Sequence, residues 1–270
     1  MERIKLALER ARQTRNGAAP PQLAQVDDRG HNSGPPEEIR YTSTRTFEPD
    51  RKLLRRNRVL LDDTESSASA AFKVLRTQVL QRMSANDWTA LAISSPGQDE
   101  GKSLVSVNLA ISIALEANHT VLLADLDLRR PGVHTYFGYE PEFGLSDHLL
   151  HDVPMSQILF NPGIDGLVVL PGRERLPNSS EALSSRKMVK LVSELKSRYP
   201  NRMVLFDLPP LLSADDALAF SPYVDAALLV LRDGHTSRDH VLRSVGYLES
   251  THLLGTVLNH SDEFVTPAYY

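Results

Sequence analysis

The stretch ALAISSPGQDEGKS, residues 90–103, decides the fold. It begins with a short apolar run typical of a buried strand, and residues 104–116 after it have the pattern of a helix. A loop between a strand and a helix N-terminus presents backbone N–H groups and the positive end of the helix dipole to a polyphosphate. The closing Gly-Lys-Ser fits such a loop, although Pro96 stands where the general pattern has its first glycine. The sequence therefore predicts a nucleotide-phosphate site here.

The residues of this loop have distinct expected roles. Gly101 allows close approach of the backbone, Lys102 reaches the β- and γ-phosphates as a point charge, and the Ser103 hydroxyl is a ligand of magnesium. A Gly-Lys-Ser tripeptide is common by chance, so its position between a strand and a helix carries the prediction. The loop residues expected to contact the nucleotide are Gly97, Gln98, Asp99, Glu100, Gly101, Lys102, Ser103 and Leu104.

Apolar runs alternate with amphipathic helical patterns along the rest of the chain. Besides residues 90–94, the runs expected to be strands are 120–124, 166–170, 203–206, 226–231 and 254–258. Because these runs are nearly continuous, they indicate strands that are buried on both faces. A helix is expected before the first of them, from about residue 63 to residue 84. The predicted fold class is α/β: a doubly wound, mainly parallel sheet flanked by helices, as in P-loop NTPases.

Two further strands end in carboxylates. Residues 125–131 (DLDLRRP) place Asp125 and Asp127 at the carboxyl edge of the sheet, where ligands bind in open α/β folds. Strand alternation directs both to the same side, so both could address one metal ion or one nucleophile. Residues 203–210 (MVLFDLPP) place Asp207 at the same edge, as the magnesium-side carboxylate of a P-loop site. Three separate segments thus converge on one chemistry.

Composition narrows the class of protein. The chain has 270 residues, 41% of them hydrophobic, which suits one catalytic domain with an extension. A formal net charge of -4 gives no electrostatic reason to expect nucleic acid as a partner. The absence of cysteine excludes disulfides and thiolate metal sites and fits the cytosol. No run approaches the roughly 20 apolar residues that cross a bilayer.

The chain divides into four predicted segments. Residues 1–16 have apolar residues at near-helical spacing, typical of an amphipathic helix, and residues 17–50 are rich in Pro, Gly, Ser and charge, as in a flexible linker. The P-loop domain is expected over residues 51–260, beginning with a basic run, residues 51–58, that reads as a solvated short helix. Residues 261–270 form an acidic tail with terminal tyrosines.

These motifs resemble those of the bacterial protein-tyrosine kinases of capsule and exopolysaccharide loci, within the MinD/ParA-like group of P-loop proteins. The resemblance spans about residues 64–270. It rests on the phosphate loop at 95–103, DLDLRRP at 125–131, GLSDHLL at 144–150, LPGRERLPNSSEAL at 170–183, DLPP at 207–210 and Asp-Asp-Ala at 215–217. Partition-type relatives carry an additional lysine early in the phosphate loop, and residues 94–100 contain none, which favours the kinase branch. The initial MERIKLALERAR resembles stand-alone members that lack a fused membrane segment.

The resemblance implies a tyrosine autokinase that uses ATP and Mg²⁺ and phosphorylates its own C-terminal Tyr269 and Tyr270 in trans, within a ring. It implies a cytoplasmic protein that is peripheral to the inner membrane through its activator, a membrane-embedded polysaccharide chain-length regulator. A tyrosine phosphatase is the further expected partner, and nucleic acid is not expected. The activity would regulate the polymerisation and export of exopolysaccharide or capsule.

The resemblance also implies roles for single residues. Lysine, metal and carboxylates suffice for phosphoryl transfer, because that reaction needs mainly positioning and charge neutralisation. Asp125 is the candidate that orients or deprotonates the tyrosine hydroxyl, and Asn259 is expected near the adenine. The catalytic set is Lys102, Asp125, Asp127 and Asp207. The metal ligands are Ser103, Asp127 and Asp207, and the nucleotide set includes Arg129 and Asn259 beside the loop.

The chain departs from the family pattern at three places, which keeps two alternatives open. Asp99 stands where relatives commonly have Gly, and a carboxylate facing a triphosphate predicts weaker ATP binding. The family's ring-interface motif ExxRxxR aligns here as Ala70, Lys73 and Arg76, which removes bidentate pairing and predicts a weaker ring. The tail has only two tyrosines. The alternatives are a kinase-inactive regulatory P-loop ATPase of the same polysaccharide machinery and a MinD/ParA-like organising ATPase.

Overall fold

The computed structural model describes residues 44–61, 66–116, 119–197 and 202–261. Within them, eight strands form one sheet in the order β1-β4-β5-β3-β6-β2-β7-β8. Neighbouring strands are parallel, except that β4 and β5 are antiparallel. The strands are β1 (Arg45–Thr46), β2 (Ala90–Ser94), β3 (Thr120–Asp125), β4 (Phe160–Asn161), β5 (Leu167–Leu170), β6 (Arg202–Asp207), β7 (Ala226–Arg232) and β8 (His252–Asn259).

The six predicted strands are confirmed as β2, β3, β5, β6, β7 and β8, with ends within about two residues of those expected. Every residue of β2, β3, β5 and β6 is buried, as their continuous apolar runs predicted. The strands β1 and β4 were not predicted, because two residues are too few to show a period. The predicted doubly wound, mainly parallel sheet is confirmed.

Helices occupy most of the connections between strands. The helix predicted over residues 63–84 is present as α3, and the short helix predicted in the basic run is present as α2. The helices are α2 (Arg51–Arg56), α3 (Ser67–Ser84), α4 (Lys102–Ala114), α5 (Val133–Phe137), α6 (Leu145–His151), α7 (Met155–Ile158), α8 (Ser179–Leu183), α9 (Arg186–Ser197), α10 (Asp216–Phe220), the 3₁₀ turn η1 (Ser221–Tyr223) and α11 (Arg238–Tyr247).

The folded unit begins earlier than residue 51. Residues 44–50, which were assigned to the linker, carry β1, and Phe47 packs against Tyr139 with ring centroids 5.2 Å apart. Asp50 caps α2 by accepting a hydrogen bond from the backbone N–H of Lys52 at 2.9 Å. The described fold therefore includes residues 44–50, seven residues more than predicted. The predicted N-terminal helix, the linker up to residue 43 and tail residues 262–270 lie outside the described residues.

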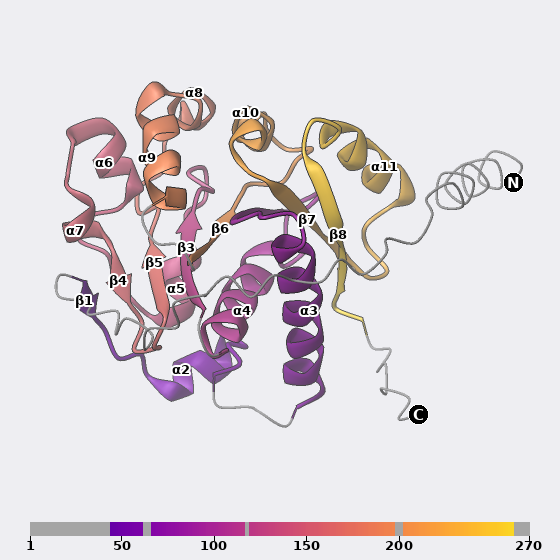
Figure 1. Cartoon of the computed structure of the whole chain (residues 1–270), viewed down its shortest axis with the longest axis horizontal. Coiled ribbons are helices and arrows are strands. Elements are labelled where there is room, and N and C mark those ends of the chain that lie inside the picture. Colours follow the sequence, from indigo (N-terminus) through magenta and orange to yellow (C-terminus); the bar gives the residue numbers. More distant parts are fainter. Residues whose placement is uncertain (1–43, 62–65, 117–118, 198–201, 262–270) are drawn as a thin grey trace, which may run out of the picture. The chain divides into compact units, whose positions relative to one another are not determined.

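The helices cover both faces of the sheet, which gives two apolar cores. One core joins the sheet to side chains of α2, α3, α4 and α5, and the other joins it to side chains of α6 to α10. Figure 1 shows α3 and α4 together on one side and α8, α9 and α10 on the other. The helix α4 is buried along almost its whole length, from Val105 to Ala114. None of the helices in the described part of the chain is long and apolar enough to span a membrane.

The strand order brings the sequence motifs together. The strands β3, β6 and β2 are consecutive neighbours in the sheet and run parallel, so that their carboxyl ends meet at one edge. Asp125 at the end of β3 pairs in register with Asp207 at the end of β6, and Asp207 also pairs with Ile93 near the end of β2. The phosphate loop that follows β2 therefore lies beside both acidic segments.

Candidate active site

The phosphate loop, residues 95–101, connects β2 to α4. The helix begins at Lys102, two residues before the predicted start, so Lys102 and Ser103 lie in its first turn. The N–H groups of a first turn have no partner within the helix and carry the positive end of its dipole. Gly101 has a φ of +89°, and a Cβ there would collide with Nδ2 of Asn259. Glycine suits this position, because the backbone has a positive φ and passes close to Asn259.

Lys102 is held between two carboxylates. Its Nζ lies 2.8 Å from Oδ2 of Asp127 and 3.4 Å from Oδ2 of Asp207. Burial opposes the charge of the ammonium group, but the carboxylates of Asp207 and Asp127 outweigh it and raise the pKa of Lys102. The lysine is therefore a permanent positive charge at the carboxyl edge of the sheet, as the phosphate-binding role requires.

Asp207 is a fully buried carboxylate of the site. Its Oδ2 accepts a hydrogen bond from the Ser103 hydroxyl at 2.6 Å, and its Oδ1 accepts one from the Ser106 hydroxyl at 3.0 Å. Burial raises the pKa of Asp207, although Lys102 and the two hydroxyls oppose the shift. Ser106 was not predicted. It lies four residues after Lys102 on the same face of α4, which is the signal that identifies it.

The structure gives Asp125 and Asp127 different partners, although strand alternation predicted that both address one ligand. The Asp125 carboxylate accepts hydrogen bonds from the backbone N–H groups of Asp127, Gly132 and Val133, at 3.2, 2.8 and 3.0 Å. The reason is that the chain turns back after Asp127 and brings these N–H groups over the end of β3. Burial, with a contribution from Asp207, raises the pKa of Asp125 to about 7. Asp127, in contrast, contacts Lys102.

The side chains at the tip of the phosphate loop face different surroundings. Gln98 is exposed, and its Oε1 accepts a hydrogen bond from Nη1 of Arg130 at 3.0 Å. Asp99 is also exposed and has a φ of +58°, a conformation that glycine adopts without cost. Glu100 is only 2% exposed, and its Oε1 accepts a hydrogen bond from the Thr236 hydroxyl at 2.7 Å. Of these three residues, Glu100 alone has its side chain directed into the protein.

Arg129 and Asn259, the two predicted nucleotide-binding residues outside the loop, each hold a neighbouring segment. Nε of Arg129 donates to Oδ2 of Asp216 at 2.7 Å, and Nη2 lies 3.5 Å from Asp215, so the Asp-Asp-Ala motif is its partner. The hydrogen bond and charge of Asp216 raise the pKa of Arg129. Asn259 ends β8 and donates from Nδ2 to the carbonyl of Glu100 at 3.0 Å. Asn259 therefore lies against the phosphate loop.

The donor set fits magnesium held together with phosphates. Among the described residues, no three His, Cys, Asp or Glu side chains gather into a ready metal cluster. Magnesium commonly takes one or two carboxylates or a hydroxyl from the protein and completes its octahedron with phosphate oxygens and waters. Ser103 and Asp207 are in direct contact, and Asp127 and Asp207 both lie within 3.5 Å of one ammonium group. These oxygens therefore suit the cation of a nucleotide complex.

The positions of the ring-interface motif lie on α3. Ala70 and Lys73 are exposed on this helix. Arg76 lies against α4 of the same chain, where its Nε is 2.6 Å from Oε2 of Glu116 and its Nη1 donates to the carbonyl of Ser112 at 3.2 Å. Arg76 thus has partners inside the fold.

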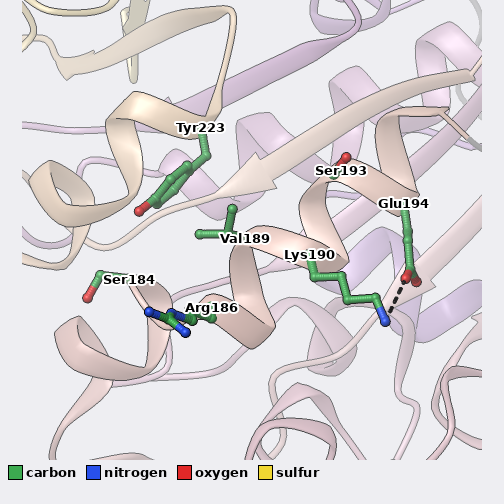
Figure 2. Close-up of a pocket in the computed structure, with 7 residues that line it drawn as sticks. All are labelled: Ser184, Arg186, Val189, Lys190, Ser193, Glu194 and Tyr223. Atoms are coloured by element: carbon green, nitrogen blue, oxygen red, sulfur yellow. Dashed lines mark ion pairs between the residues drawn. The ribbon is translucent and has the colours of Figure 1, made fainter.

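A surface hollow lies away from the phosphate loop, along α9 beside η1. It has a volume of about 590 Å³ and is lined by Ser184, Arg186, Val189, Lys190, Ser193, Glu194 and Tyr223. Figure 2 shows Lys190 and Glu194 side by side on successive turns of α9, and their charged atoms are 3.8 Å apart. None of the residues that line this hollow is among those predicted to bind nucleotide or metal.

A lysine and a hydroxyl at a helix start, opposed by carboxylates from neighbouring parallel strands, define a P-loop nucleotide-binding protein. Solved structures share this architecture. The kinase domain of Escherichia coli tyrosine kinase ETK is 29% identical and superposes with a TM-score of 0.72, over 83% of this chain and 91% of that one. The septum site-determining protein MinD of Pyrococcus horikoshii, complexed with Mg-ADP, shares the fold at 22% identity and a TM-score of 0.53.

Sequence comparison assigns the family. No protein-family model matches the chain. Tyrosine-protein kinase YwqD of Bacillus subtilis is 32% identical over 208 residues, which cover 76% of this chain and 86% of that protein. The succinoglycan biosynthesis transport protein ExoP of Rhizobium meliloti is 27% identical over 214 residues, which cover 77% of this chain and 27% of that protein. The chain belongs to the family of bacterial tyrosine-protein kinases.

Proposed function

We propose that this enzyme transfers phosphate from ATP to the tyrosines of its own tail, residues 269–270, with Mg²⁺ as cofactor. The observation that carries the proposal is the contact of Lys102 and Ser103, at the start of α4, with the carboxylates of Asp127 and Asp207. Phosphoryl transfer requires mainly positioned charge, and this cluster supplies a cation for the phosphates and oxygens for the metal. The Mg-ADP complex of MinD supports the choice of cofactor, since that protein shares the fold.

The proposed reaction is a single displacement at the γ-phosphorus. The tyrosine oxygen bonds to the γ-phosphorus as the bond to the β,γ-bridging oxygen breaks, ADP leaves, and the hydroxyl proton passes to a carboxylate of the site. Lys102 contacts the phosphates and balances their charge. Ser103, Asp127 and Asp207 would hold Mg²⁺, which would supply positive charge to neutralise the phosphates.

The geometry points to different roles for Asp125 and Asp127. The Asp125 oxygens are engaged by three backbone N–H groups of residues 127–133. Asp125 therefore positions the loop that carries Asp127 and Arg129. Asp127 contacts the flexible side chain of Lys102, which a phosphate can draw away. Nucleotide binding would then free the Asp127 carboxylate to serve as a ligand of Mg²⁺.

The proposed setting is polysaccharide export. The name of the related ExoP protein places a relative in succinoglycan biosynthesis and transport. We propose a cytoplasmic enzyme that associates with the inner membrane through a membrane-embedded polysaccharide chain-length regulator as activator. It would self-associate for phosphorylation in trans, and a tyrosine phosphatase would reset the tail.

Mixing two inactive variants tests the reaction in trans. Lys102→Met retains the tail but lacks the phosphate-binding lysine, and the double variant Tyr269→Phe/Tyr270→Phe retains the site but lacks the acceptors. Intact mass spectrometry after incubation with ATP and Mg²⁺ distinguishes the two chains by mass. We expect phosphate on the Lys102→Met chain in the mixture and on neither chain alone. Phosphorylation of wild type without transfer in the mixture would contradict the trans reaction.

A further inference from the structure

The tip of the phosphate loop is held by three residues that lie in the last two strands of the sheet or in the turn after β7. The Thr236 hydroxyl donates to Oε1 of Glu100 at 2.7 Å, and Nδ2 of Asn259 donates to the carbonyl of the same residue at 3.0 Å. Nη1 of Arg232 lies 3.4 Å from the carbonyl of Asp99. These residues belong to β7, to the turn between β7 and α11, and to the end of β8, which lie together at one edge of the sheet (Figure 1).

Thr236 connects the phosphate loop to the end of β7. Its hydroxyl oxygen accepts a hydrogen bond from the backbone N–H of Arg232 at 2.8 Å while it donates to Glu100. The same turn is closed by a backbone hydrogen bond from the N–H of Thr236 to the carbonyl of Arg232 at 2.9 Å. One hydroxyl group thus joins the last residue of β7 to the phosphate loop.

The buried position of the Glu100 carboxylate depends on the Thr236 hydroxyl. The Glu100 side chain lies under Gly97, since a Cβ on that glycine would be 3.5 Å from Oε1. In the described part of the chain, its second oxygen, Oε2, is buried without a hydrogen-bond partner. A carboxyl group that is taken out of water needs hydrogen bonds to remain there. Loss of the Thr236 hydroxyl would leave both oxygens without one and would favour movement of Glu100 toward solvent.

Movement of Glu100 would reach the phosphate site directly. The residue lies between Asp99 at φ +58° and Gly101 at φ +89°, and Lys102 follows at the start of α4. This backbone shape orients the N–H groups that are expected to face the phosphates. We propose that Thr236 is a positioning residue for nucleotide binding, which acts through the Glu100 carboxylate to hold the phosphate loop in its binding conformation. The role rests on the proposed function, because it requires that the loop binds nucleotide.

Two substitutions at Thr236 separate the hydroxyl from the rest of the side chain. Thr236→Val keeps the shape and removes the hydroxyl, whereas Thr236→Ser keeps the hydroxyl. We expect Thr236→Val to raise the Kd for a fluorescent ATP analogue roughly tenfold, as loss of a hydrogen bond to a charged group predicts. Thr236→Ser should remain within about twofold of wild type. In the kinase assay, Thr236→Val should raise KM for ATP more than it lowers kcat.

Thr251→Val is the matched control for a purely structural threonine. Thr251 is buried, and its hydroxyl donates to the carbonyl of Ser221 at 3.2 Å, away from the phosphate loop. This variant should lower the thermal midpoint without a change in nucleotide Kd. The positioning role would be overturned if Thr236→Val had the nucleotide Kd of wild type, whether or not it also lowered the thermal midpoint as Thr251→Val does. The kinase proposal would be unaffected by that result. A wild-type protein that binds no nucleotide would refute the proposed function and the positioning role together.

Discussion

The ammonium nitrogen of Lys102 lies 2.8 Å from Oδ2 of Asp127. The two groups come from the start of α4 and from the loop after β3, and only 12% and 8% of their side chains are exposed. The phosphate-binding cation is thus paired with one of the proposed metal ligands. A triphosphate that contacts Lys102 has to replace Asp127 as its partner, and the released carboxylate then requires a cation.

This pairing predicts opposite effects of Asp127→Asn on two forms of binding. Without magnesium, the variant should bind ADP more tightly, because Lys102 loses a competing charge. Magnesium should tighten ADP binding to wild type roughly tenfold more than it tightens ADP binding to the variant, because the variant lacks a charged metal ligand. Fluorescence titrations of a labelled ADP in EDTA and in MgCl₂ measure both. Asp165→Asn, an exposed substitution before β5, is the control. An unchanged ratio of the two Kd values would contradict the assignment of Asp127.

Lys102→Met should also destabilise the protein itself. The substitution leaves the buried carboxylates of Asp127 and Asp207 without their counter-charge, and breaking a buried pair from one side costs about 3 kcal/mol of unfolding free energy. Urea unfolding followed by circular dichroism measures the difference, and Mg²⁺ should restore part of it. Lys190→Met is the matched control, because the Lys190–Glu194 pair is exposed on α9 and contributes less than about 0.5 kcal/mol. Equal losses from the two substitutions would argue against a tightly paired Lys102.

Asp99→Asn should strengthen ATP binding. Asparagine tolerates the positive φ of this position as aspartate does, so the substitution removes only the negative charge near the triphosphate. We expect the Kd for ATP to fall by about two- to fivefold at low ionic strength and the difference to shrink at high salt. Asp87→Asn provides the control, since Asp87 has a φ of +55° in the turn before β2, outside the phosphate loop. A weaker ATP complex in Asp99→Asn would show that this carboxylate supports the site.

Asp225 gives a prediction for the pH dependence of stability. Burial alone would raise its pKa, but hydrogen bonds from Lys196 and from the backbone N–H groups of Thr89 and Ala90 outweigh it and lower the pKa. A lowered folded pKa means that the stabilisation is present above the ordinary aspartate pKa of about 4 and is lost as the pH falls through the folded value. Asp225→Asn should therefore cost about 1–2 kcal/mol at pH 7, and the difference from wild type should disappear in acid.

Thermal or urea unfolding from pH 7 down to pH 3 tests this dependence. Asp152→Asn is the control, because Asp152 is exposed and its pairing with Lys187 lies at the surface. The Lys187 hydrogen bond lowers the pKa of Asp152 as well, but because the pair is at the surface this substitution should have a much smaller effect than Asp225→Asn at pH 7. A constant difference between wild type and Asp225→Asn across the range would contradict the role of the charge.

The strands and the edge of the sheet that carries the site were predictable, because apolar runs mark buried strands and ligands bind at the carboxyl ends of parallel strands. The apolar runs gave the six strands, and parallel strands bring Asp125 and Asp207 to the same edge as the Gly-Lys-Ser loop. The partners of Asp125 were not predictable. Its carboxylate accepts hydrogen bonds from backbone N–H groups up to eight residues later in the chain. The intervening turn has no periodic pattern of apolar residues from which its path could be predicted.

The contacts that shape the phosphate loop escaped prediction for a different reason. Thr236 meets Glu100 across 136 residues, and Asn259 meets it across 159 residues. Contacts of that separation depend on strand order, which a sequence pattern does not contain. The predicted roles of Arg129 and Asn259 toward a nucleotide remain predictions, since the structure shows them holding Asp216 and the loop backbone.

Tandem mass spectrometry of the purified chain after incubation with ATP and Mg²⁺ tests the central claim most directly. It is performed with and without cytoplasmic segments of a candidate activator, and with Lys102→Met as the control. The account predicts phosphate on Tyr269 or Tyr270 in wild type and none in Lys102→Met. ATP binding without phosphate on either tyrosine under any of these conditions would contradict it and would identify the chain as a regulatory ATPase within its family.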